Sequence, residues 1–217
     1  MTSEPSDTLQ HALQRFEMQV PEYAFPKLER YCQSVWELNQ TMNLTRHTNF
    51  EKFVTRDLLD SLQLSRLIKQ NAEVLDVGSG GGVPGLLLAI LRPDLKVTLT
   101  DSVGKKARAM GEIADKVDAP VEIYQIRAEE LLEDFRYDVT TARAVGPLKK
   151  IAIWFERVWP SVGELLAIKG PNWKEEKAEA DLDGRFRRCD FSVAAEYNVP
   201  GEDWSSVILS IRAKRSK

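Results

Sequence analysis

The spacing of apolar residues divides the chain into two stretches of different texture. Up to residue 70 the apolar positions recur at helical intervals and no strand-like run interrupts them. This spacing predicts three amphipathic helices, over residues 6–19, 26–42 and 49–69. Ser6 or Asp7 is the expected N-cap of the first helix. We expect residues 1–70 to form a helical cap that packs on the remainder of the chain.

From Glu73 onward, strand-like and helix-like runs alternate. Strands are expected over residues 73–77, 96–100, 121–126, 137–142 and 162–168, and helices over 84–92, 103–117, 128–134, 147–159 and 173–183. Such alternation indicates an α/β fold with a parallel sheet covered on both faces. Two further runs, 188–198 and 205–213, are separated by Pro200-Gly201 and predict an antiparallel hairpin.

Five parallel strands followed by a hairpin are typical of one class of α/β protein. The dinucleotide-binding sheet stays parallel, whereas the sheet of class I S-adenosylmethionine methyltransferases ends in an antiparallel hairpin. We therefore predict a Rossmann-like, mostly parallel seven-stranded sheet. On this interpretation residues 71–217 form the methyltransferase domain and residues 1–70 the N-terminal helical cap.

Residues 73–89 join a predicted buried strand to a predicted helix through a glycine-rich turn. Such a turn brings backbone N–H groups close to a ligand at a helix N-terminus. Gly80, Gly82 and Gly85 have the spacing of a dinucleotide site, but Asp76 stands just before the first glycine. A carboxylate beside the ligand disfavours a pyrophosphate and favours the cationic S-adenosylmethionine. The cofactor-binding residues expected in this stretch are Asp76, Gly78, Ser79 and Gly80. A sharp turn without a ligand is the alternative.

Polar residues also follow the next two predicted strands. Asp101 and Ser102 end the second strand, where an acid is placed to hydrogen-bond the ribose hydroxyls of an adenosine. Arg127-Ala-Glu-Glu130 follows the third strand at the same edge of the sheet, so the backbone of Ala128 and Glu129 is placed to meet an adenine. A helix cap and an ordinary helix start are the respective alternatives.

Two cations follow the fourth and fifth predicted strands, Arg143 and Lys169. Both are expected to project into the ligand crevice, because ligands bind at the carboxyl ends of parallel strands. A guanidinium suits a methionine carboxylate, a nucleobase or an RNA phosphate. Two cations at neighbouring strand ends favour an anionic or electron-rich substrate. Arg143 and Lys169 are therefore the predicted catalytic residues.

Charge and composition narrow the possible partners. The net charge is −3, yet basic residues cluster at Lys105-Lys-Ala-Arg108, at Lys149-Lys150 and in the tail 212–217. A basic patch can bind phosphates on a protein that is acidic overall. The two cysteines and two histidines have no metal-like spacing, so we expect free thiols and no metal. No apolar run is long enough for a membrane span, and the N-terminus has no secretory pattern, so a cytoplasmic protein is expected.

Two motifs of nucleobase methyltransferases do not occur in the chain. No Asn-Pro-Pro-Tyr or Asp-Pro-Pro-Tyr tetrapeptide, used for exocyclic amino groups, follows the fourth predicted strand, and no Pro-Cys nucleophile is placed for attack on a pyrimidine. A ring nitrogen with a free lone pair, such as guanine N7, needs neither. Positioning and electrostatics suffice for that acceptor.

Nearly the whole chain resembles the bacterial 16S ribosomal RNA guanine-N7 methyltransferases, also called the glucose-inhibited division protein B family. The resemblance rests on these motifs: Asn43-Leu-Thr45, Leu59-Asp-Ser61, Asp76-Val-Gly-Ser-Gly-Gly-Gly-Val-Pro-Gly85, Asp101-Ser-Val-Gly-Lys-Lys106, Arg127-Ala-Glu-Glu130, Ala142-Arg-Ala144 and Lys169-Gly170. The Pro-Gly end of the glycine stretch and the Asp-Ser-x-x-Lys-Lys block are specific to this family within the wider fold.

The resemblance implies transfer of a methyl group to N7 of the guanine at nucleotide 527, in the 530 loop of the small-subunit RNA. It implies that the cofactor contacts are Gly78, Val83, Ala128, Glu129 and Arg143. It also implies that Lys105, Lys106 and Lys169 lie on the RNA side, and we predict Arg127 as a further RNA-binding residue. The naked RNA, an assembly intermediate and the whole small subunit are possible substrates, and the protein is expected to act as a monomer.

The chain departs from the family pattern at two places. Arg56-Asp57 stands where the family usually has Arg-His, and Trp204-Ser-Ser-Val207 stands where it usually has Glu-Arg-His-Leu. The RNA contact of that C-terminal arginine is thus not predicted here, and Arg212 or the basic tail is the candidate to replace it. Three other functions stay open: a methyltransferase of this fold with another acceptor, a non-catalytic RNA-binding or ribosome-assembly protein, and an NAD-dependent oxidoreductase.

Overall fold

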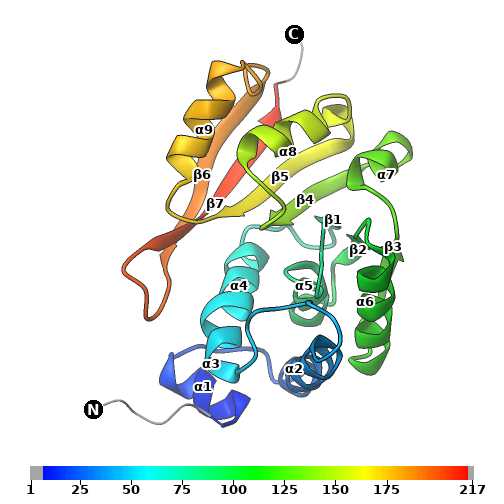
Figure 1. Cartoon of the computed structure of the whole chain (residues 1–217), viewed down its shortest axis with the longest axis vertical. Helices are drawn as coiled ribbons and strands as arrows, with labels where there is room; N and C mark the ends of the chain where they lie inside the picture. The colour runs from blue at the N-terminus through cyan, green and yellow to red at the C-terminus, as the bar shows by residue number, and fades with distance from the viewer. Residues whose placement is uncertain (1–6, 215–217) are drawn as a thin grey trace.

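One seven-stranded sheet, in the order β3-β2-β1-β4-β5-β7-β6, organises the computed structural model, which describes residues 7–214 (Figure 1). The strands are β1 (Glu73–Val77), β2 (Lys96–Thr100), β3 (Val121–Tyr124), β4 (Tyr137–Arg143), β5 (Val162–Lys169), β6 (Cys189–Asn198) and β7 (Ser205–Ala213). The first five strands pair in parallel, and β7 pairs antiparallel with both β5 and β6. The predicted parallel sheet and terminal hairpin are confirmed.

In the described part of the chain, five helical segments precede the first strand, and the others lie between strands. They are α1 (Leu9–Arg15), α2 (Phe25–Asn39), α3 (Phe50–Lys52), the π-helical segment η1 (Phe53–Leu58), α4 (Leu59–Ser65), α5 (Gly85–Leu91), α6 (Gly104–Lys116), α7 (Ala128–Asp134), α8 (Leu148–Phe155), the 3-10 turn η2 (Trp159–Ser161) and α9 (Trp173–Leu182). No helix within residues 7–214 is both long and apolar enough to cross a membrane.

Two separate cores lie on the two faces of the sheet. Residues alternate sides along a strand, so Leu166 and Ile168 of β5 join one buried cluster, and Leu165 and Ala167 join the other. Helices α7, α8 and α9 cover the second face. Helices α5 and α6 cover part of the first face, and the N-terminal helices cover the rest.

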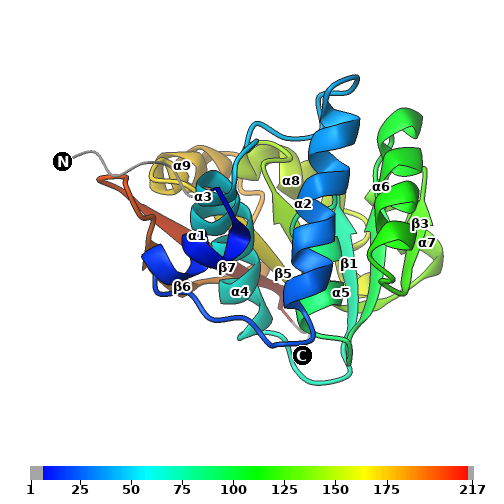
Figure 2. The ribbon, with the colours of Figure 1, turned by 90° about the horizontal axis from the view of Figure 1, so that it is seen from below.

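The N-terminal helices share the first core with the sheet. Leu28 of α2 and Leu64 of α4 belong to the same buried cluster as Val97 of β2 and Ile208 of β7. Seen from below (Figure 2), α2 lies alongside α5 and α6, while α1 and α4 lie beneath the β5–β7 side of the sheet. The described part of the N-terminal segment, residues 7–70, thus completes one helical layer of the fold.

Two details of the N-terminal helices differ from the expectation. Thr8 is the N-cap of α1, and its hydroxyl accepts a hydrogen bond from the His11 N–H. Asp7 is therefore not the cap, and Ser6 lies outside the described residues. The helix predicted over 49–69 ends at Ser65 and contains the π-helical segment η1. A π-helical turn often marks a functional site, and η1 carries Asp57.

Candidate active site

A cavity of about 450 Å³ opens beside the glycine-rich turn, at the carboxyl edge of the parallel strands. Its lining is drawn from the ends of β1 to β4 and from α6, α7 and α8: Val77, Gly78, Thr100, Asp101, Ser102, Lys106, Ile126, Arg127, Ala128, Glu129, Ala144, Val145, Lys150 and Trp154. We call it the glycine-loop cavity. It brings together seven predicted site residues, namely Gly78, Asp101, Ser102, Lys106, Arg127, Ala128 and Glu129.

The Asp101 carboxylate ties the glycine-rich turn to the end of β2. One carboxylate oxygen accepts a hydrogen bond from the Gly80 N–H at 3.1 Å, and the other accepts one from the Val103 N–H at 2.8 Å. Each oxygen of a carboxylate has a second lone pair, so Asp101 can anchor the turn and still accept hydrogen bonds from a ligand. Gly80 therefore supports the site through Asp101 and does not line the cavity itself.

Gly78 leaves the mouth of the cavity open. Its backbone is in the left-handed region, with φ of +63°, and a Cβ here would lie 2.9 Å from Cγ1 of Val145. Both facts require glycine at the start of the turn. The other predicted residues of the turn are placed elsewhere: Ser79 is buried, and Val83 packs against the first core. Neither lines the glycine-loop cavity.

Asp76 is predicted as a cofactor-binding residue, but its side chain does not line the glycine-loop cavity. Its side chain is 0% exposed; one oxygen accepts a hydrogen bond from the Thr141 hydroxyl at 2.7 Å, and the other accepts one from the Gly85 N–H at 3.0 Å. It joins β1, β4 and the start of α5 from beneath the turn. Burial raises the pKa of this carboxyl to about 6, although its hydrogen bonds act in the opposite direction.

Replacement of Asp76 with asparagine is expected to remove a pH dependence of stability. An unfolded aspartate has a pKa of about 3.9, so the folded state binds this proton more tightly. The stabilisation is present at low pH and is lost as the pH rises through about 6. Relative to the Asp76→Asn variant, the wild type should lose about 1.4 kcal/mol of unfolding free energy between pH 5 and pH 8. Urea denaturation of both proteins at these two pH values measures the difference, and parallel pH profiles would refute it.

A second cavity, of about 800 Å³, lies on the other side of Ala144, between the sheet and the N-terminal helices. Its lining is Leu44, Thr45, Arg46, His47, Arg56, Asp60, Arg143, Ala144, Gly146, Pro147, Ile168, Lys169, Gly170, Glu176, Trp204 and Ser206. We call it the cap cavity. Ala144 lines both cavities and has a φ of +56°. A strained backbone of this kind in a non-glycine residue is typical of functional sites.

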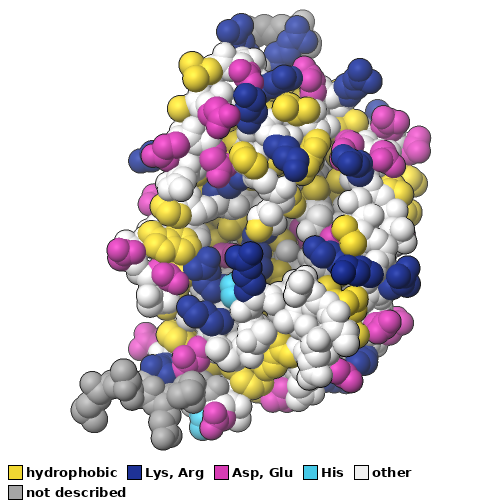
Figure 3. Space-filling view, in the orientation of Figure 1, with side chains coloured by type: hydrophobic (Ala, Val, Ile, Leu, Met, Phe, Trp, Pro, Cys, Tyr) yellow, Lys and Arg dark blue, Asp and Glu magenta, His cyan; other side chains and the backbone are white. Residues whose placement is uncertain are grey.

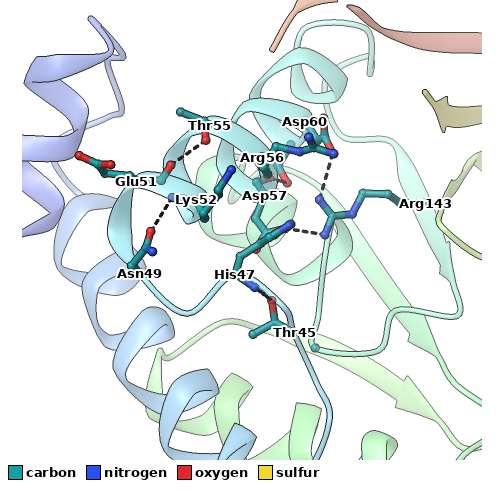
Figure 4. A network of polar contacts seen from close by, with 12 residues as sticks. Thr45, His47, Asn49, Glu51, Lys52, Thr55, Arg56, Asp57, Asp60 and Arg143 are labelled. Atoms are coloured by element: carbon teal, nitrogen blue, oxygen red, sulfur yellow. Dashed lines mark hydrogen bonds and ion pairs between the residues drawn. The ribbon is translucent and has the colours of Figure 1, made fainter. Parts of the chain in front are cut away.

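Arg143 lies in the cap cavity and is held by two carboxylates (Figure 4). Its guanidinium contacts Asp57 of η1 at 2.5 Å and Asp60 of α4 at 3.0 Å. Burial alone would lower the pKa of Arg143, but attraction to these two carboxylates outweighs burial and raises it. Arg143 does not line the glycine-loop cavity, so its predicted role as a cofactor contact is not supported. Its donors are directed instead toward the N-terminal helices.

The same network reaches a histidine and a tyrosine. His47 Nδ1 lies 2.8 Å from Asp57, and the Tyr197 hydroxyl donates a hydrogen bond to Asp60 at 2.7 Å. Burial raises the pKa of Asp57, but Arg143 and His47 lower it further, so it falls below its usual value. Asp57 is thus held between Arg143 and His47, a histidine supplied by the loop before α3.

Lys169 is also engaged within the protein. Its ammonium group donates hydrogen bonds to the Gly146 carbonyl at 2.6 Å and to the Glu176 carboxylate of α9 at 2.7 Å, and its side chain is 10% exposed. Both predicted catalytic cations are therefore compensated by nearby acids. Arg143 and Lys169 both line the cap cavity, so their predicted role toward a substrate stays a prediction, now for side chains that are held by ion pairs.

Two aromatic residues at the site, one that lines a cavity and one that supports the glycine-rich turn, were not predicted as site residues. Trp154 of α8 lines the glycine-loop cavity, with the Lys150 ammonium 4.9 Å from its ring centroid. Tyr31 of α2 is buried and donates a hydrogen bond to the Gly81 carbonyl at 2.8 Å, which ties the cap to the glycine-rich turn. Helical spacing alone marks both residues as core positions, so no local signal in the sequence distinguishes them.

Basic side chains gather across the middle of the molecule, between the sheet and the N-terminal helices (Figure 3). Lys105 is exposed on α6 beside Lys106, and Arg127 lies 3.5 Å from Glu129 at the mouth of the glycine-loop cavity. Arg212 does not join this surface, because it pairs with Glu164 near the amino end of β5, at the opposite edge of the sheet. Residues 215–217 of the basic tail lie outside the described part.

Among residues 7–214, no group of His, Cys, Asp and Glu side chains is arranged to hold a metal ion. Cys32 and Cys189 are free and buried.

The sequence of the chain is similar to a family of known proteins. A family model described as rRNA small subunit methyltransferase G (GidB) matches residues 24–201. The ribosomal RNA small subunit methyltransferase G of Rhodopirellula baltica is 47% identical over 186 residues, which is 86% of this chain and 80% of the relative. That of Halorhodospira halophila is 38% identical over 176 residues, 81% of this chain and 83% of the relative.

Solved structures share the fold at low sequence identity. A methyltransferase from Pyrococcus furiosus superposes with a TM-score of 0.57 at 12% identity, covering 85% of this chain and 96% of that chain. A precorrin-6y C5,15-methyltransferase from Geobacter metallireducens superposes with a TM-score of 0.53 at 17% identity, covering 80% of this chain and 92% of that chain. The fold is therefore the Rossmann-like fold of methyltransferases, as predicted.

Proposed function

Since the chain belongs to the rRNA small subunit methyltransferase G family, we propose that it methylates guanine N7 in 16S ribosomal RNA, at nucleotide 527 of the 530 loop. The observation that carries the proposal is the pair of cavities that meet at Ala144. One has the shape and polarity for a methyl donor, and the other opens among cationic side chains. The cytoplasm is the compartment in which we expect it to act, as a monomer.

S-adenosylmethionine is the cofactor of this enzyme, and the glycine-loop cavity fits it. Ile126, Val145 and Trp154 provide an apolar wall of the kind an adenine requires. Asp101 provides carboxylate oxygens for ribose hydroxyls, and the missing side chain of Gly78 keeps the mouth open. These residues would hold the nucleoside.

The reaction demands little proton chemistry from the protein. When bound, S-adenosylmethionine supplies an electrophilic methyl group. Guanine N7 carries a lone pair and no proton, so no side chain has to act as a general base. The protein's contribution is to orient the acceptor and to exclude water. Arg143 and Lys169 both line the cap cavity. Because ion pairs fix them, they shape that cavity as rigid groups.

The RNA side of the proposal rests on the cap cavity and on the basic surface beside it. Arg46 lines the cap cavity and has no ion-pair partner among the described residues. Lys105, Lys106 and Arg127 extend the positive surface toward the glycine-loop cavity. Lysine and arginine contacts with phosphates position an RNA without reading its sequence. The target base must leave its stack to reach the methyl donor.

Methyl transfer to small subunits tests the proposal. Subunits and naked 16S RNA from a strain that lacks the gene are incubated with the purified protein and labelled S-adenosylmethionine. We expect one methyl group per RNA, located at N7 of nucleotide 527 by borohydride and aniline cleavage. The comparison of subunits, assembly intermediates and naked RNA identifies the substrate form.

The Asp101→Ala variant provides the matched control. It should lose at least tenfold in affinity for S-adenosylmethionine, because each hydrogen bond to a charged group is worth about 1.5–3 kcal/mol. Calorimetry measures that affinity. Transfer to a protein or metabolite in place of RNA would establish a different acceptor, and absence of cofactor binding in the wild type would favour an assembly role or an NAD-dependent enzyme.

A further inference from the structure

The outer wall of the cap cavity contains an arginine stacked on a tryptophan. The Arg56 guanidinium of η1 lies 4.6 Å from the ring centroid of Trp204, which stands just before β7. Glu202 in the same hairpin loop lies 3.6 Å from Arg56 and 3.8 Å from Lys52. These contacts hold the hairpin loop against the N-terminal helices. They also fix the Arg56 guanidinium and the Trp204 indole in place.

Trp204 is not part of either hydrophobic core. The chain has five tryptophans: Trp36 packs against the first core, and Trp154, Trp159 and Trp173 pack against the second. Trp204 packs against neither and lines the cap cavity, partly exposed. A tryptophan side chain is large and apolar, so its position at the wall of an open cavity calls for a ligand with a flat apolar face.

The charges around the stack indicate which ligand. The cap cavity is lined by the cations Arg46, Arg56, Arg143 and Lys169 and by the acids Asp60 and Glu176. Both acids are already paired, with Arg143 and Lys169 respectively. Of the other two cations, Arg56 lies over the indole and pairs with Glu202, and Arg46 has no ion-pair partner among the described residues. A partly exposed aromatic ring beside cationic side chains is the arrangement that proteins use to stack the bases and hold the phosphates of single-stranded RNA.

The position of Trp204 indicates which RNA base would stack on it. Trp204 lines the cap cavity and not the glycine-loop cavity, and the two cavities share only Ala144. The guanine that accepts the methyl group has to meet the methyl donor bound in the glycine-loop cavity, at the Ala144 junction, so the base assigned to Trp204 is a neighbour of that guanine. We propose that Trp204, with Arg56 stacked on it, is the platform on which an RNA base next to the target guanine stacks. The proposal rests on the proposed function and names a substrate contact within it.

Steady-state kinetics of Trp204→Ala and Trp204→Phe test the platform, with the small subunit or RNA that the wild type methylates. Trp204→Ala should raise KM for RNA about tenfold or more, whereas Trp204→Phe, which keeps a flat ring, should stay within about threefold of wild type. KM for S-adenosylmethionine should be unchanged in both. Phe135→Ala removes another partly exposed aromatic ring, 49% exposed at the opposite edge of the sheet, and should leave both KM values unchanged.

A fluorescence titration separates binding from folding. Stacking of a base on an indole quenches its emission, so the RNA-dependent quenching of the wild type should be reduced in Trp204→Phe. The proposal is overturned if Trp204→Ala has a wild-type KM for RNA. It is also overturned if Trp204→Ala lowers the melting temperature and weakens S-adenosylmethionine binding by the same factor as RNA binding. No methyl transfer by the wild type would instead refute the proposed function.

Discussion

Replacing Arg143 with methionine is expected to lower the free energy of unfolding by about 3–5 kcal/mol, because it leaves buried carboxylates without their cation. Asp57 and Asp60 are 3% and 6% exposed, and both contact the guanidinium. Methionine is similar in length and brings no charge, so packing changes little. Urea denaturation at pH 7 measures the loss. It should be larger at pH 8 than at pH 5, where the unpaired carboxylates take up protons.

The Arg143→Met/Asp57→Asn/Asp60→Asn variant is the matched control. Neutral amides in place of the carboxylates remove the cost of an unpaired buried charge, so most of the lost stability should return. Activity need not return, because the cap cavity then lacks both its cation and its acids. If the single variant is as stable as the wild type at pH 8, the ion-pair network does not stabilise the contact between the N-terminal helices and β4.

Replacing Gly85 with alanine is expected to destabilise the protein by about 3 kcal/mol or more, at the upper end of the range for overpacked cores. A Cβ at Gly85 would lie 2.3 Å from Cδ2 of Leu99, 2.6 Å from Cβ of Asp76 and 2.8 Å from an Asp76 oxygen. Leu99 and Asp76 are fully buried, so neither can move aside freely. The clash also disturbs the hydrogen bond from the Gly85 N–H to Asp76. Thermal and urea denaturation measure the effect.

Gly111→Ala is also a glycine-to-alanine substitution, but it is expected to raise the free energy of unfolding. Gly111 lies within α6, and a Cβ there would meet no atom within 4 Å. Alanine is favoured over glycine inside a helix by about 0.5–1 kcal/mol, so this variant should be slightly more stable than the wild type. Equal destabilisation by the two substitutions would contradict the close packing inferred around Gly85.

Much of the candidate site could be located from strand ends. Asp101, Ser102, Ala128 and Glu129 line one cavity because parallel strands end at a common edge, and a sequence that alternates strands and helices determines that edge. The role of Asp76 could not be located in this way. Period-two alternation places it on a face of β1, but only the tertiary structure shows that the carboxylate is buried against Thr141 and Gly85 and does not line the glycine-loop cavity.

By itself, the sequence determined the order of the elements, the parallel sheet with its terminal hairpin and the position of the glycine-rich turn. These features depend on local periodicity and on residues close together in the chain. Only the tertiary structure decided what the strand-end cations face. Arg143 is held by carboxylates 83 and 86 residues away, and Arg56 stacks on Trp204 from the far end of the chain. No local pattern encodes such contacts, because the packing of the N-terminal helices against the sheet creates them.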